Sequence, residues 1–273
     1  MAQNDFSALK NMIYSGRGIT VGMTPSGVAF IGYTLTGRSP PSQARVLVEG
    51  ENTGVIRTDV TDPEQLKKGS PALLLYPALV RHGNLLIASN GAQTDLIYSA
   101  AENAPHLVPT ESLAPAPILH LAFERPFFMY DPHNDRRIDL TSYEPDDPNF
   151  TPRISAAVRG NYAAFHIVRK AGDMKEPRLQ AKKLERGCGY IITTYKGGNE
   201  SPLLPFEGSL LEMKVGSNDP REIAHDLFAA TQHGSKPGED YSVSAAVMMD
   251  KGSGSGHSLD LRAIVNRHQV IRV

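Results

Sequence analysis

Residues 19–37 read ITVGMTPSGVAFIGYTLTG, and this stretch decides the fold class. Two runs of β-branched, aromatic and aliphatic residues flank residues 23–27, where a proline and a glycine favour a tight turn. The pattern predicts an antiparallel hairpin. Residues 46–60 repeat it, with apolar runs on either side of a turn at 51–54, and so predict more antiparallel sheet.

The rest of the chain contains further strand patterns and two helix patterns. Strands are predicted at 84–89, 154–169 with a break at 160–161, 189–195, 241–250 and 258–265, the last two around a Gly/Ser loop at 252–256. One helix is predicted over 94–103, beginning near Thr94 or Asp95, and another over 220–232 behind an Asp219 cap. Residues 104–150 are rich in proline and aspartate and predict an irregular connection.

Together these patterns indicate the fold class. Many antiparallel runs, few helices and no βαβ rhythm favour an α+β domain in which helices cover the faces of sheets. No linker-like stretch divides the chain, so residues 1–273 are expected to form one domain. The order of the strands stays open.

Composition excludes several function classes. The 28 lysines and arginines are balanced by 29 aspartates and glutamates, so no overall field favours nucleic acid or an anionic membrane as partner. Cys188 is the only cysteine, which suits a reducing cytoplasm and predicts a small buried residue more readily than a nucleophile. The amino terminus lacks a signal-peptide pattern and no stretch is long and apolar enough to span a bilayer, so we expect a cytoplasmic protein.

Common catalytic motifs are missing from the sequence. There is no phosphate loop, no nucleophile elbow and no zinc helix of the HExxH type. The glycines around Arg17 miss the dinucleotide-binding spacing, and the nine histidines are scattered, so neither a cofactor nor a metal site is predicted.

Five short blocks nevertheless occur in a specific order. They are Tyr14-Ser15-Gly16-Arg17-Gly18 with Gly22; Tyr33 with Gly37-Arg38-Ser39-Pro40 and Arg45; Ser89-Asn90-Gly91 with Thr94-Asp95; Tyr143-Glu144 with Thr151-Pro152-Arg153-Ile154; and Thr194-Tyr195. In this order and spacing the set resembles the archaeal-type IMP cyclohydrolases and their bacterial relatives. Gln43, where many relatives have a basic residue, Lys196, where an acidic residue is frequent, and the long 104–150 connection depart from the family pattern.

The resemblance implies a fold, an assembly and a reaction. The implied fold is similar to the N-terminal-nucleophile hydrolases, a four-layer αββα sandwich of two packed antiparallel sheets, although residues 1–2 offer no Ser, Thr or Cys nucleophile. Relatives suggest a homo-oligomer. The chain has no room for a second, transformylase domain, so a separate enzyme would formylate the substrate.

The implied reaction belongs to purine biosynthesis and forms inosine monophosphate (IMP). In a formylated imidazole-carboxamide ribotide, the carboxamide nitrogen attacks the formyl carbon, and water then leaves. Both reacting groups are on one molecule, so catalysis needs an attacking conformer, stabilisation of a developing oxyanion and proton transfer from nitrogen to oxygen. No redox cofactor or metal is required.

The blocks then supply candidates for binding this nucleotide. The resemblance places the 5-phosphate near arginines that can offer paired N–H donors, with Arg38 and Arg45 the strongest candidates. The predicted substrate-binding residues are Arg17, Ser39, Arg45, Gly91, Thr94, Asp95, Tyr143, Arg153, Tyr195 and Lys196. Asp95 could equally cap a helix.

Four residues are candidates for catalysis. Arg38 could stabilise charge, and Asn90 could hold the carboxamide or the oxyanion, although it also suits a turn. Glu144 could anchor the substrate or accept a proton. Tyr76 could donate a proton to the formyl oxygen, although an aromatic residue in LLLYPAL is also typical of a core.

Two alternatives stay open. A different nucleotide-like substrate could be handled by an amide hydrolase or transferase of the same fold, which the neutral Gln43 would favour. A protein that binds a nucleotide without catalysis is the second, and the presence of Arg38, Asn90 and Glu144 argues against it.

Overall fold

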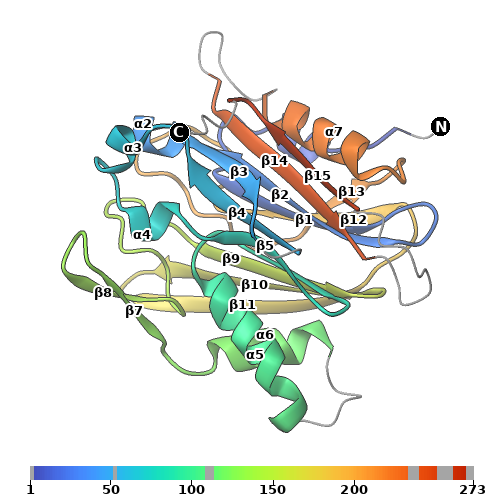
Figure 1. The fold of residues 1–273 in the computed structure, drawn as a ribbon, viewed down its shortest axis with the longest axis horizontal. Helices are drawn as coiled ribbons and strands as arrows, with labels where there is room; N and C mark the ends of the chain where they lie inside the picture. Colours follow the sequence, from blue (N-terminus) through green and yellow to red (C-terminus); the bar gives the residue numbers. More distant parts are fainter. Residues whose placement is uncertain (1–2, 52–53, 108–113, 233–239, 251–260, 269–273) are drawn as a thin grey trace.

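Two antiparallel sheets pack face to face in the computed structural model (Figure 1). It describes residues 3–51, 54–107, 114–232, 240–250 and 261–268. One sheet has the order β13 (Leu211–Lys214), β12 (Cys188–Thr193), β1 (Arg17–Met23), β2 (Ala29–Thr36), β14 (Ser242–Met249), β15 (Arg262–Asn266). The other has the order β11 (Met174–Lys183), β10 (Tyr162–Ala171), β9 (Arg153–Arg159), β6 (Leu85–Ser89), β5 (Pro77–His82), β4 (Val55–Val60), β3 (Arg45–Glu49).

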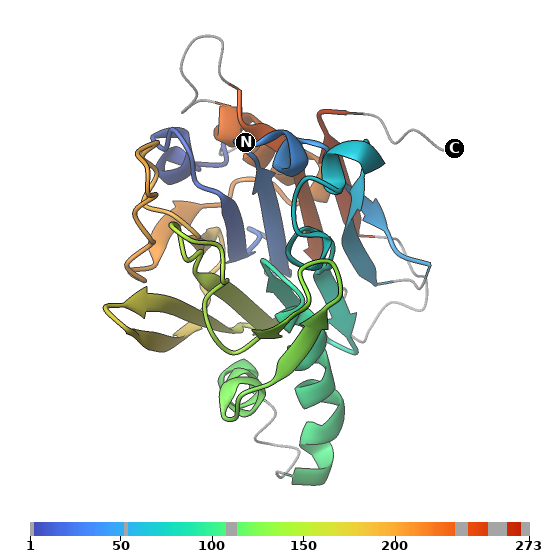
Figure 2. The ribbon, with the colours of Figure 1, turned by 90° about the vertical axis from the view of Figure 1, so that its left-hand side faces the viewer.

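Helices lie on the outer faces of both sheets (Figures 1 and 2). The first sheet is covered by α1 (Ser7–Lys10) and α7 (Pro220–Gln232), and the second by α5 (Gln93–Leu107) and α6 (Pro115–Phe123). Ile223 and Leu227 of α7 pack on one outer face, while Ile118 of α6 packs on the other. The prediction of an α+β fold with two antiparallel sheets is therefore confirmed.

The main core lies between the sheets. Ile19 and Leu35 of the first sheet meet Leu79 and Phe165 of the second in one cluster of fully buried side chains. Strands that are buried on both faces have continuous apolar sequences, which explains why β1 and β2 show little polar alternation.

The hairpin over 19–37 is confirmed as β1 and β2, with Gly18 opposite Thr34 and Met23 opposite Ala29. Thr24 Oγ1 accepts a hydrogen bond from the Val28 nitrogen at 3.0 Å and closes the turn. The strand β14 pairs with β15 as predicted, although the Gly/Ser loop between them lies outside the described residues.

The 104–150 connection is more ordered than predicted. It contains the end of α5, the helix α6 and a separate hairpin of β7 (Phe128–Asp131) and β8 (Arg136–Asp139). Proline occupies the first turn of α6, where the missing N–H is not needed, and apolar residues of that helix face the sheet. The prolines therefore begin a helix here, although the sequence pattern predicts an irregular connection.

Two further expectations were incomplete or wrong. The long strand β11 was not predicted, because it lies at the sheet edge with mostly exposed, charged residues and has no apolar alternation. Cys188 is exposed and not buried, since it begins β12 next to Gly187 in a surface turn.

Strand ends from both sheets meet at one end of the sandwich. Antiparallel pairing places the start of β1 beside the end of β12, and the start of β9 beside the end of β6. Three short helices, α2 (Pro40–Gln43), α3 (Pro63–Leu66) and α4 (Pro71–Leu74), lie at the same end, as does the β7–β8 hairpin (Figure 1). Polar residues far apart in the sequence are brought together there.

Candidate active site

A cleft of about 840 Å³ opens at this end of the sandwich. Figure 2 shows the ribbon with this end facing the viewer. Its walls come from the start of β1, the region of α2 to α4, the β7–β8 hairpin, the 144–151 segment and the chain after β12. A cavity of this size fits a nucleotide-sized molecule.

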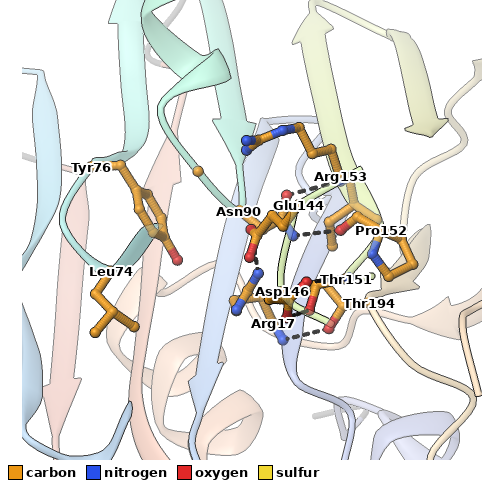
Figure 3. Close-up of polar contacts among 12 residues, drawn as sticks. Arg17, Leu74, Tyr76, Asn90, Glu144, Asp146, Thr151, Pro152, Arg153 and Thr194 are labelled. Carbon is orange, nitrogen blue, oxygen red and sulfur yellow. Dashed lines mark hydrogen bonds and ion pairs between the residues drawn. The ribbon is translucent and has the colours of Figure 1, made fainter. Parts of the chain in front are cut away.

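A buried ion pair lies at the floor of the cleft. Arg17 Nη2 donates to Glu144 Oε1 at 2.6 Å, and the two side chains are only 10% and 4% exposed (Figure 3). Burial raises the pKa of Glu144, and the Arg17 charge opposes that shift. Burial disfavours the charged form of Arg17, but Glu144 and three nearby tyrosines together outweigh it and raise the pKa of Arg17, which stays protonated. The pair is fixed and shielded from water.

A second carboxylate lies in the same cleft. Asp146 Oδ1 accepts from the Thr151 backbone nitrogen at 2.7 Å, and Asp146 Oδ2 accepts from the Thr151 hydroxyl (Figure 3). The Thr151 oxygen also lies 2.6 Å from the Tyr195 hydroxyl. Burial raises the pKa of Asp146, and the bonds from Thr151 oppose it.

Behind the floor, a polar network holds the start of β9. Asn90 Nδ2 donates to the Pro152 carbonyl at 2.8 Å, and Asn90 Oδ1 accepts from the Ile154 nitrogen at 2.9 Å. Gln93 connects this amide to Arg153, accepting from Arg153 Nη1 at 2.8 Å. Arg153 Nε and Nη2 have no hydrogen-bond partner among the described residues, although the side chain is buried.

Gly91 and Thr94 serve the same network. A Cβ added to Gly91 would lie 2.6 Å from both Arg153 Nη1 and Gln93 Oε1, so only glycine allows this approach. The Thr94 hydroxyl donates to the Gly91 carbonyl at 3.0 Å at the beginning of α5. Gly91 therefore leaves room for Arg153, and Thr94 holds the Gly91 carbonyl; neither residue is among the described residues that line the cleft.

The rim of the cleft carries Arg38 and Ser39. Arg38 Nη1 donates to Asn199 Oδ1 and to the Glu200 carbonyl, both at 3.1 Å, and its guanidinium lies over the Tyr14 ring at 5.2 Å. The Ser39 hydroxyl caps α2 by accepting from the Ser42 nitrogen. These contacts hold the two residues in place at the opening.

Tyr76 and Arg45 are buried beside the cleft and are not among its lining residues. The hydroxyls of Tyr76 and Tyr33 lie 2.8 Å apart, and Figure 3 shows Tyr76 pointing toward Arg17 and Glu144. Arg45 donates from Nε to the Ser42 carbonyl at 3.0 Å and from Nη1 to the Leu74 carbonyl at 3.5 Å, which fixes the end of α4.

Three other predicted binding residues lie apart from the described lining. Asp95 is exposed in the first turn of α5. Lys196 is exposed and forms an ion pair with Glu207. Tyr143 packs edge-on against Phe150, with ring centroids 5.8 Å apart. The cleft thus contains Arg17, Arg38, Ser39, Glu144 and Tyr195 of the predicted set.

Several lining residues were missed by sequence reasoning. Asp146, Lys68 and Arg136 lie in stretches without periodicity, where charges are usually solvated, and no local pattern marks them. Tyr14 and Thr151 belong to the sequence blocks but were given no role. Gln43 donates to the carbonyls of Gly37 and Asp240, so its neutral amide braces the chain near α2.

Membrane-spanning helices and metal-binding clusters are both absent from the described residues. No helix there is long and apolar enough to cross a membrane. No cluster of three or more His, Cys, Asp or Glu side chains that could hold a metal ion occurs in that part of the chain.

Fold and site together define a two-sheet α+β protein with a charged, small-molecule-sized cleft where strand ends of both sheets meet. The sequence pattern of the IMP cyclohydrolase-like protein family matches residues 14–125 and 136–254. The chain belongs to this family.

Individual relatives agree with the family match. The IMP cyclohydrolase of Methanococcus aeolicus is 25% identical over 185 residues, covering 67% of this chain and 75% of that protein. The IMP cyclohydrolase of Methanothrix thermoacetophila is 26% identical over 191 residues, covering 70% and 78%. A relative from Methanococcus maripaludis with the same name is 24% identical over 187 residues, covering 68% and 77%.

Proposed function

We propose that this chain is an IMP cyclohydrolase, closing the six-membered ring of 5-formamido-imidazole-4-carboxamide ribotide to give IMP and water. Family membership and three relatives of that name support the activity. The observation that carries the proposal for this site is the set of charged side chains that line the cleft. The described lining contains four cationic side chains, Arg17, Arg38, Lys68 and Arg136, and two carboxylates, Glu144 and Asp146.

An excess of positive charge suits a ribotide. The 5-phosphate is dianionic near neutral pH, and guanidinium and ammonium groups bind it through charge-assisted hydrogen bonds. We place the phosphate at the rim, near Arg38, Ser39 and Lys68, because both bonds held by Arg38 come from Nη1 alone and leave its other nitrogens to face a ligand.

The imidazole carboxamide then reaches the floor of the cleft. Glu144, fixed by Arg17, would accept a hydrogen bond from the carboxamide N–H and hold it in an attacking conformer. Arg17 would stabilise negative charge that develops on the formyl oxygen, because it is a cation that lines the cleft. Tyr76 would donate toward the same oxygen from the opposite side.

Asn90 and Arg153 take supporting roles in this proposal. Asn90 is buried and uses its amide to hold residues on both sides of Arg153, which supports a positioning role for it over direct contact with the oxyanion. Arg153 adds a buried positive charge behind Glu144. The two-sheet sandwich further supports a likeness to the N-terminal-nucleophile hydrolases in fold.

The test is ultraviolet-monitored formation of IMP from the synthetic formylated ribotide, with purified protein, with and without a chelator. We expect turnover that survives chelation. Arg38→Ala should chiefly raise KM, and Asn90→Ala or Tyr76→Phe should chiefly lower kcat. No turnover above the uncatalysed rate in folded protein would refute the proposal, and wild-type kinetics in all three variants would refute the site.

No specific observation favours the alternative of a different substrate. Gln43, whose neutral side chain would favour it, is not among the described lining residues and binds main-chain carbonyls. The reaction therefore stays the one implied by the family.

A further inference from the structure

A chain of hydrogen bonds connects the cleft with Asp146. Tyr195, Thr151 and Asp146 all line the cleft, and their side chains are joined in that order, with 2.6 Å between the Tyr195 and Thr151 oxygens. The chain is separate from the ion pair of Arg17 and Glu144. Neither Thr151 nor Asp146 belongs to the residues that the sequence suggested for substrate binding or catalysis.

The direction of the hydrogen bonds follows from the chemistry of their ends. An ionised carboxylate only accepts, so the single hydroxyl proton of Thr151 points to Asp146. The Thr151 oxygen must then accept from Tyr195, whose own proton points away from the substrate space. The phenol oxygen therefore presents a lone pair to the cleft.

Burial keeps this phenol in its neutral form. It raises the pKa of Tyr195 well above the ordinary range of tyrosine. A buried neutral oxygen that has already donated its proton can accept an N–H, and it can pass a proton on only if its own proton moves at the same time.

We infer that Tyr195 is a catalytic residue that takes a proton from the carboxamide nitrogen, and that Thr151 and Asp146 are positioning residues that pass this proton on. The inference rests on the proposed function. As the bond between the carboxamide nitrogen and the formyl carbon forms, the π electrons of the formyl group move to its oxygen. The N–H proton goes to Tyr195, the Tyr195 proton to Thr151, and the Thr151 proton to Asp146.

The same chain of hydrogen bonds can return the proton. In the tetrahedral intermediate the nitrogen and the oxygen are bonded to one carbon, so a single hydroxyl can contact both in turn. The proton on Asp146 moves back through Thr151 and Tyr195 to the negative oxygen and makes a hydroxyl. The second proton, from the formamide nitrogen, joins the same oxygen as the C–O bond breaks, and water leaves.

A purely structural role is the competing explanation, because Asp146 also accepts from the Thr151 backbone and shapes the 146–151 loop. A similar Asp–Thr pair elsewhere in the protein offers a matched control for this structural explanation. Asp139 Oδ1 accepts from both the nitrogen and the hydroxyl of Thr141, at 2.8 and 2.7 Å, in the same connection. Neither Asp139 nor Thr141 is among the described lining residues.

The experiment compares Thr151→Val and Tyr195→Phe with Thr141→Val in the IMP-forming assay. General acid–base catalysis contributes about 10²- to 10⁴-fold, so kcat should fall by about 100-fold in the first two, with KM within about threefold. The control should keep wild-type kcat, and Thr151→Ser should restore most of the lost rate. In wild-type protein kcat should fall on the acid side as Asp146 takes up a proton, and that dependence should disappear in Thr151→Val.

Each outcome decides one question. If the wild type turns over and Thr151→Val has the same kcat as the Thr141→Val control, the inferred proton transfer through Thr151 is overturned and the proposed function stands. A lower kcat in Thr151→Val with an unchanged pH profile would show that Thr151 has a structural role, and it would also overturn the inferred proton transfer. Absence of turnover in the wild type would refute the proposed function itself. Thermal melts establish folding, and if Thr151→Val does not fold, Tyr195→Phe and Thr151→Ser carry the test.

Discussion

Replacing Glu144 by glutamine keeps the shape of the side chain but removes the charge that faces Arg17. Arg17 Nη2 lies 2.6 Å from Glu144 Oε1, and both side chains are buried, so the variant leaves a cation in the interior without its main counter-charge. Breaking a buried pair from one side costs about 3–5 kcal/mol. The glutamine oxygen still accepts a hydrogen bond and Asp146 also attracts Arg17, so we expect the lower end of this range.

The assay is urea and thermal unfolding near neutral pH. A loss of about 3 kcal/mol corresponds to a Tm lower by about 5 °C in a chain of this size. Glu176→Gln is the matched control, because Glu176 forms ion pairs with Arg169 and Arg178 at the surface, where such pairs stabilise little. A Glu144→Gln variant as stable as Glu176→Gln would refute the reasoning that the cleft floor is shielded from water. The double variant Arg17→Met with Glu144→Leu should regain stability while activity stays lost.

Three further predictions concern other parts of the molecule. Tyr33→Phe and Tyr76→Phe should each lower the free energy of unfolding by about 1–2 kcal/mol, because each leaves the other hydroxyl unpaired. The double variant should lose less stability than the sum of the two single variants. Only the variants that lack the Tyr76 hydroxyl should lower kcat. Burial lowers the pKa of His166 to about 4. The stability that its neutral side chain contributes is complete above the unfolded pKa of about 6.5 and is lost as pH falls toward 4. Urea unfolding should show this loss, of about 3 kcal/mol or less, in the wild type but not in His166→Gln. Gly16→Ala should lower Tm more than Gly83→Ala, because both have positive φ but only the methyl at position 16 would overlap a neighbouring side chain; equal melts would contradict this.

The fold was predictable where burial leaves a pattern in the sequence. The hairpin over 19–37 and the helix behind Asp219 have long apolar stripes and clear turn or cap residues, and both are present. The edge strand β11 and the β7–β8 hairpin bury little and therefore carry no such pattern. Strand order could not be predicted because it depends on contacts between residues far apart in the chain.

The site was predictable only in part, for a related reason. Arg17, Arg38 and Glu144 belong to ordered sequence blocks, and the cleft contains all three. Asp146 and Lys68 reach the cleft only because the 144–151 segment and the end of α3 fold back over the strand ends, which no local pattern encodes. Arg45, which we expected near the phosphate, is buried and donates to the carbonyls of Ser42 and Leu74.

The two carboxylates of the cleft suit different tasks because their partners differ. Glu144 faces a cation that favours its ionised form against the effect of burial, whereas Asp146 faces hydroxyls that could carry a proton to it and away again. The charge of Asp146 also raises the pKa of Glu144. Uptake of a proton by Asp146 would remove this repulsion and so favour the ionised form of Glu144. The proposed ring closure moves one N–H proton at a time, so one carboxylate would act as this acceptor while the other would keep the substrate in place.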